Sequence, residues 1–88
     1  MIKVKVLFFA ASQDLAGCKE SELELPTNST IGEFRKKLVE NYTSLKKVER
    51  SFSIAMNSTY ARDDEIVIDG CEIAIIPPVS GGKGDNNL

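Results

Sequence analysis

Residues 69–82 read DGCEIAIIPPVSGG and decide the fold of this chain. The Asp-Gly pair is typical of a turn, because glycine adopts positive φ without steric cost. The apolar run at 71–76 predicts a buried or half-buried strand. Pro77 and Pro78 end that strand, because proline has no N–H to donate to the sheet ladder. We therefore expect a last strand that closes a sheet and continues into an extended segment.

Residues 77–82 are expected to form a flexible C-terminal tail. Pro77 and Pro78 favour an extended, polyproline-like path that holds the following residues away from the domain. Gly81 and Gly82 have no side chains, so their backbone can enter a channel too narrow for other residues. At ~3.3 Å per residue, such a segment reaches roughly 20 Å. The geometry predicts a delivery arm.

The N-terminal third predicts two paired strands. Residues 2–9 alternate between an inward set (Ile2, Val4, Val6 and Phe8) and an outward set (Lys3, Lys5, Leu7 and Phe9). The outward set begins charged and ends apolar, which indicates an interface. Residues 10–19 are expected to be a connection, and residues 20–25 the second strand, with Leu23 and Leu25 inward and three glutamates outward.

The middle of the chain predicts one main helix. Thr30 and Glu33 form a capping-box pattern, in which each side chain bonds the other residue's backbone N–H. The inward face is then Ile31, Phe34, Leu38 and Tyr42, and the solvent side Arg35, Lys36, Lys37 and Glu40. A short helical or irregular segment at 45–48, a strand at 52–57 and a brief extended piece at 59–61 follow. Strands at both ends around one helix predict an α+β domain.

Composition limits the function. Eighty-eight residues suit one domain, and a net charge of −2 gives no electrostatic footprint for nucleic acid. No apolar run reaches the ~20 residues that span a bilayer, and no signal peptide is recognisable, so we expect a cytoplasmic protein without membrane association. There is no histidine, and the two cysteines, Cys18 and Cys71, lack metal-ligand spacing. We expect no metal site, no bound cofactor and no self-sufficient active site.

The string IPPVSGG at residues 76–82, with the opening MIKVKVLFFA at 1–10, resembles the sulfur carrier (small) subunits of molybdopterin synthase. These belong to the ubiquitin-like β-grasp sulfur carriers. The resemblance spans residues 1–82. It implies a β-grasp fold, a mixed sheet with one main helix on one face and its first and last strands adjacent and parallel. The implied organisation is a domain at 1–76, a Gly-Gly delivery tail at 77–82 and a disordered extension at 83–88.

The resemblance also implies a mechanism in which Gly82 carries sulfur. A partner adenylyltransferase resembling ubiquitin-activating enzymes would use ATP, with magnesium, to adenylate the Gly82 carboxylate, and sulfur would displace the nucleotide to give a thiocarboxylate. A large catalytic subunit, in a heterotetramer, would take in the tail and pass the sulfur to a pterin precursor. Gly81 and Ser80 would belong to the tail that enters this subunit, and Pro77 and Pro78 would stiffen its exit. The implied partner-facing residues are Phe9, Tyr60 and Ile76.

Residues 83–88 depart from the family pattern, which usually stops at the second glycine. With Lys83 attached, the carbonyl of Gly82 is an amide rather than a carboxylate. Several explanations of residues 83–88 remain open. A protease could remove them, they could be an artificial addition, or they could begin a linker to a fused large subunit. It also remains open that the protein has lost carrier chemistry and acts only as a binding module. Alternative functions of the same tail are sulfur carriage for tRNA thiolation or thiamin, and ubiquitin-like modification of lysines.

Overall fold

In the computed structural model, which describes residues 1–77, the elements follow the order β-α-β-α-3₁₀-β-β-β. Their bounds are β1 (Ile2–Phe8), α1 (Ala11–Ala16), β2 (Glu20–Leu25), α2 (Ile31–Asn41), η1 (Thr43–Val48), β3 (Ser53–Met56), β4 (Thr59–Tyr60) and β5 (Glu72–Ile76). The expected α+β class is confirmed. Within the described range, no helix is long and apolar enough to cross a membrane.

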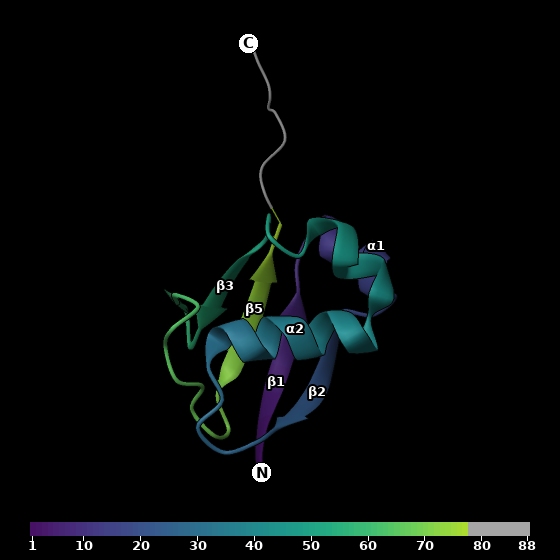
Figure 1. The fold of residues 1–88 in the computed structure, drawn as a ribbon. Helices are drawn as coiled ribbons and strands as arrows, with labels where there is room; N and C mark the ends of the chain where they lie inside the picture. Colours follow the sequence, from purple (N-terminus) through teal and green to yellow (C-terminus); the bar gives the residue numbers. More distant parts are fainter. Residues whose placement is uncertain (78–88) are drawn as a thin grey trace.

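The strands form one mixed sheet in the order β2-β1-β5-β3-β4 (Figure 1). β1 and β2 pair antiparallel, with Val4 opposite Leu23, as the alternation predicts. β1 and β5 pair in parallel at the centre of the sheet, with Val6 opposite Ile73. β3 then runs antiparallel to β5, and the two-residue β4 completes the edge. The central parallel pair and the β-grasp topology are therefore confirmed.

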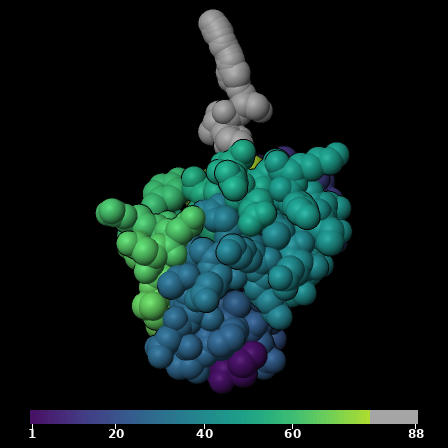
Figure 2. All heavy atoms as spheres, viewed as in Figure 1, coloured from purple at the N-terminus to yellow at the C-terminus, as the bar shows by residue number. Residues whose placement is uncertain are grey.

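α2 crosses one face of this sheet and buries the core beneath it (Figure 1). Figure 2 views this covered face, where the atoms of α2 and η1, blue and teal, lie over the sheet. The largest fully buried side chains come from the strands, from α2 and from η1: Phe8, Phe34, Leu25, Ile31, Leu38, Leu45, Ile54, Ile73 and Ile75. The predicted inward faces of the first two strands and of the helix are correct, and Tyr42 packs edge-on against Phe8 at a centroid distance of 5.3 Å.

The start of α2 follows the predicted capping box. The hydroxyl of Thr30 accepts from the backbone N–H of Glu33 at 3.2 Å, and the Glu33 carboxylate accepts from the backbone N–H of Thr30 at 2.8 Å. Two of the N–H groups that a helix leaves unpaired at its start are thus satisfied locally.

Two expectations were wrong. Residues 10–19 contain the short helix α1, which no side-chain cap begins and which lies against β1 and η1. Arg35 does not point into solvent: its side chain is 14% exposed and its guanidinium stacks 4.7 Å from the Phe52 ring centroid. Its N–H groups donate to the carbonyls of Glu49 and Phe52, both at 2.7 Å. A guanidinium can lie over the face of an aromatic ring and still donate its outer N–H groups to nearby carbonyl oxygens.

Candidate functional site

The sheet has a second face that α2 leaves open. In β1 and β5 buried residues alternate with more exposed ones, and the exposed set is on the side away from the helix. The register carries this set across the sheet, because directly paired residues point to the same face. Leu7 pairs with Ala74, Ala74 with Ala55, and Ala55 with Tyr60. One row of small and apolar side chains thus runs across the open face.

Extending the β1–β5 register by one residue places Phe9 beside Ile76, and Ile76 pairs with Ser53. Phe9 is 46% exposed and Tyr60 is 69% exposed, whereas Ile76 is half-buried. We call this set the open-face patch; it consists of Leu7, Phe9, Tyr60, Ala74 and Ile76. Exposed apolar side chains that gather on one surface are a common basis for protein interfaces.

The other half of the open face is charged. Lys3 pairs with Glu24, and Lys5 lies between Glu22 and Glu72. The face is therefore divided along the strand direction. Its charged half lies where β1 and β5 begin, and its apolar half lies where they end. Because β5 continues directly into Pro77, the open-face patch lies at the end of the sheet from which the predicted tail starts.

The structure places the three predicted partner-facing residues on one face of the sheet: Phe9 and Ile76 lie side by side where β5 ends, and Tyr60 lies on the edge strand β4 in the row of Ala74. Pro77, the last described residue, follows β5 directly. The other predicted tail residues, Pro78, Ser80, Gly81 and Gly82, lie outside the described residues, as does the extension 83–88. The predicted roles of these residues, and the boundaries of the tail and the extension, remain predictions.

Ala74 joins the open-face patch but was not singled out from the sequence. Strand alternation carries the signal, because Ala74 lies between the buried Ile73 and Ile75 and must point to the opposite face. Its small side chain leaves room for a partner to approach the strand closely. Leu7, noted in the sequence for its outward position, is half-buried on the same face.

The two thiols differ in environment. Cys71 is 3% exposed at the start of the last strand, and burial raises its pKa above the ordinary value of a thiol. It therefore remains a neutral, weakly nucleophilic core side chain near pH 7. Cys18 is half-buried in the loop after α1, and both cysteines are free. Among residues 1–77, no group of three His, Cys, Asp or Glu side chains is arranged to hold a metal ion.

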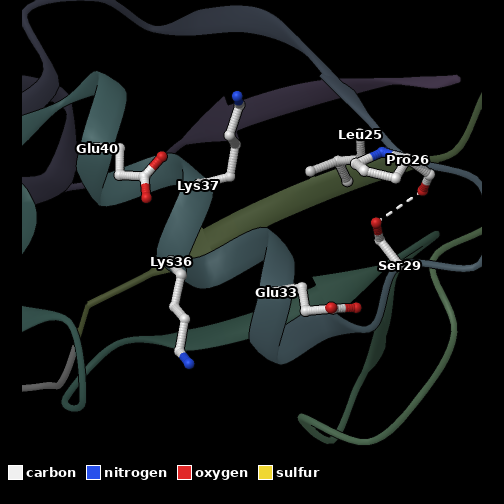
Figure 3. Close-up of a pocket in the computed structure, with 7 residues that line it drawn as sticks. All are labelled: Leu25, Pro26, Ser29, Glu33, Lys36, Lys37 and Glu40. Carbon is white, nitrogen blue, oxygen red and sulfur yellow. Dashed lines mark hydrogen bonds between the residues drawn. The ribbon is translucent and has the colours of Figure 1, made fainter.

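A groove of about 360 Å³ lies on the opposite side of the domain, between α2 and the turn after β2 (Figure 3). Its walls are charged side chains of the helix and the turn residues Pro26 and Ser29, which are joined by a hydrogen bond of 2.7 Å. None of the predicted site residues lines this groove. The open face, rather than this groove, is the candidate functional site.

The mixed sheet with α2 on one face, and with an apolar patch beside the end of its central C-terminal strand, defines a small ubiquitin-like β-grasp domain. The chain belongs to the ThiS family, whose model matches residues 6–82. This match includes β5 and both predicted tail glycines.

The comparisons agree with this membership. The chain is 39% identical over 84 residues to the molybdopterin synthase sulfur carrier subunit of Caenorhabditis elegans, covering 93% of this chain and 100% of the relative. Molybdopterin converting factor subunit 1 from Pyrococcus furiosus superposes with a TM-score of 0.82 at 30% identity, over 90% of this chain and 100% of that one. A chain of the complex of subunits 1 and 2 of molybdopterin-converting factor from Helicobacter pylori shares the fold, with a TM-score of 0.66 at 23% identity, over 92% of this chain and 100% of that one.

Proposed function

We propose that this chain is the sulfur carrier subunit of a molybdopterin synthase and that Gly82, once it is C-terminal, bears the transferred sulfur. The observation that carries the proposal is the position of the open-face patch beside the strand end that continues into the tail. A partner docked on Phe9, Tyr60 and Ile76 lies next to the origin of the tail. The identity to sulfur carrier subunits over nearly the whole chain supports the same conclusion.

The chemistry requires activation by a partner, because a carboxylate is a poor electrophile. An ATP-dependent adenylyltransferase, using magnesium, would convert the Gly82 carboxylate into an acyl adenylate. A sulfur nucleophile would then attack the carbonyl carbon and displace the nucleotide, which leaves a thiocarboxylate. This chain would contribute the carrier end and the docking surface, and the catalytic groups would come from partners.

The proposed acceptor complex contains a large catalytic subunit that binds the pterin precursor. The Helicobacter pylori complex of two subunits supports a partner of this kind. A heterotetramer of two carriers and two large subunits would allow two sulfurs to reach one pterin. The division of the open face, with Phe9 and Ile76 at one end and paired lysines and glutamates at the other, supports a docked orientation. The cytoplasmic location stays a prediction.

Mass spectrometry of the protein from its native cell tests directly whether the chain ends at Gly82 and carries sulfur there. We expect a chain that ends at Gly82, with a fraction in which one carboxylate oxygen is replaced by sulfur. A chain that always retains residues 83–88 would refute the proposal, because Gly82 would then have no carboxylate to activate.

A reconstituted reaction separates carriage of sulfur from modification of lysines, the main alternative. With a chain trimmed to end at Gly82, we expect sulfur transfer to a pterin precursor in the presence of the large subunit and the activating enzyme. Deletion of Gly82 should abolish transfer without affecting the fold, because the domain core ends at β5. Recovery of Gly82 in isopeptide bonds to target lysines, without sulfur transfer, would favour the modifier.

A further inference from the structure

Ser12 is a buried hydroxyl beside the end of the central strand pair. It is 2% exposed, and Ser29 is the other buried polar residue in the described chain. The Oγ of Ser12 donates to the carbonyl oxygen of Phe9 at 2.5 Å, and the carbonyl oxygen of Ile75 lies 3.4 Å from the same Oγ. The backbone N–H of Ser12 also donates to Phe9, at 3.1 Å. Ser12 thus contacts the ends of both β1 and β5.

These bonds close a strained turn. Ala10 adopts φ 52° and ψ −132°, near the first central position of a type II′ turn, where glycine is favoured. A non-glycine residue in such a conformation costs about 1–3 kcal/mol and persists where its surroundings hold it in place. The two bonds from Ser12 to the carbonyl of Phe9 provide that constraint. The turn therefore fixes the backbone that leaves Phe9.

The two carbonyls near Ser12 belong to functionally different residues. Phe9 is part of the open-face patch, and Ile75 comes two residues before Pro77. The backbone N–H of Phe9 donates to the same carbonyl of Ile75, at 3.2 Å. One buried hydroxyl and one backbone bond thus join the partner-facing aromatic residue to the strand end from which the tail continues.

We propose that Ser12 is a positioning residue for sulfur delivery, which fixes Phe9 relative to the end of β5. This role rests on the proposed function, because it requires a partner that docks on Phe9 and receives the chain end. Removal of the Ser12 hydroxyl leaves the carbonyls of Phe9 and Ile75 without this donor, which allows the end of β5 to shift relative to Phe9. Displacement of reacting atoms by about 1 Å can slow a reaction ~100-fold.

Ser29 provides a matched control. It is 4% exposed, its Oγ donates to the carbonyl of Pro26 at 2.7 Å, and its N–H donates to the same carbonyl at 3.2 Å. It therefore repeats the bonding pattern of Ser12 at the other end of the domain, beyond β2. Ser12→Ala and Ser29→Ala each remove one buried hydroxyl, so we expect both to lower stability by similar amounts.

The test measures sulfur transfer and binding separately, with chains that end at Gly82 and carry the thiocarboxylate. At saturating large subunit, we expect the single-turnover transfer rate of Ser12→Ala to fall at least about tenfold, whereas Ser29→Ala transfers like the unsubstituted chain. Ser12→Thr, which keeps the hydroxyl, should restore the rate. Saturation removes the effect of weaker binding, and the Kd of each variant is measured in parallel.

The outcomes separate this role from the proposed function. If the unsubstituted thiocarboxylated chain transfers no sulfur, the proposed function and with it the role of Ser12 are wrong. If that chain transfers sulfur and Ser12→Ala matches it, or slows only as much as Ser29→Ala, the positioning role alone is wrong. Should Ser12→Ala not fold, Ser12→Cys keeps most of the volume with a weaker donor, and its rate is compared with that of Ser29→Cys in the same way.

Discussion

Replacing Phe9 with alanine should weaken binding of the large subunit by an amount set by the exposed part of the ring. Phe9 is 46% exposed, and a phenylalanine of about 200 Å² therefore offers about 90 Å² to a partner. At ~25 cal/mol per Å², burial of that area contributes about 2 kcal/mol. This corresponds to about a 30-fold increase in Kd. The remaining half of the residue is already covered within the domain.

Isothermal titration of chains ending at Gly82 against the large subunit measures this change. Ile66→Ala is the matched control, because Ile66 is 51% exposed and its backbone bridges to Thr30 at the start of α2, away from the open face. Its affinity should remain that of the unsubstituted chain. Thermal unfolding of both variants verifies that they are folded at the titration temperature. The docking role of the open-face patch would be refuted if Phe9→Ala and the unsubstituted chain had equal Kd values. It would also be refuted if Phe9→Ala and Ile66→Ala lost the same affinity.

Three further predictions concern stability. Thr30→Ala should lower the free energy of unfolding by about 1 kcal/mol, seen in urea titration as a lower midpoint with an unchanged slope; an unchanged midpoint would mean that the capping box does not stabilise α2. Ala10→Gly should raise the free energy of unfolding by about 1 kcal/mol, because glycine adopts the positive φ of this turn without strain; a loss of stability would contradict the strained turn. Burial raises the pKa of Cys71, so its unfolded form ionises first as pH rises. The stability that the neutral, buried Cys71 thiol contributes is therefore fully present below the ordinary thiol pKa. Above it, the free energy of unfolding decreases by at most about 1.4 kcal/mol per pH unit. Urea titrations between about pH 8 and pH 10 should show this decrease in the unsubstituted chain relative to Cys71→Ala, and parallel pH dependences would contradict it.

Much of the fold follows from local patterns. The alternation in residues 2–9 and 20–25 predicted both strands and their inward faces, because one covered face of a sheet requires a period of two. Thr30 and Glu33 placed the start of α2, since the capping box uses only contacts within one turn. The parallel pairing of β1 with β5 came from the family resemblance, because strand order alone leaves several topologies open.

The features that sequence reasoning missed depend on distant contacts. α1 has six residues and no side-chain cap, and a helix of that length forms only where tertiary packing holds it. Arg35 followed the helical period of solvent-facing residues, but Phe52 and the carbonyls beside it, on another segment, draw its guanidinium inward. The partner-facing roles of Phe9, Tyr60 and Ile76 were predicted from the resemblance and stay predictions. The outward residues of 2–9 already indicated the change from charged to apolar, and the register of the sheet was needed to extend it to the neighbouring strands.

The central pairing of β1 with β5 determines when the sheet can form during synthesis of the chain. Lys5 pairs with Glu72, so the middle of the sheet forms from two segments near opposite ends of the sequence. A ribosome makes the N-terminal segment first, and β1 then lacks its central neighbour until residues 72–76 have been translated. Gly82 follows only a few residues later. A nascent chain can therefore complete its sheet only after most of its residues have been made, and a prematurely terminated chain that lacks β5 lacks both the middle of the sheet and the β5 residues of the open-face patch.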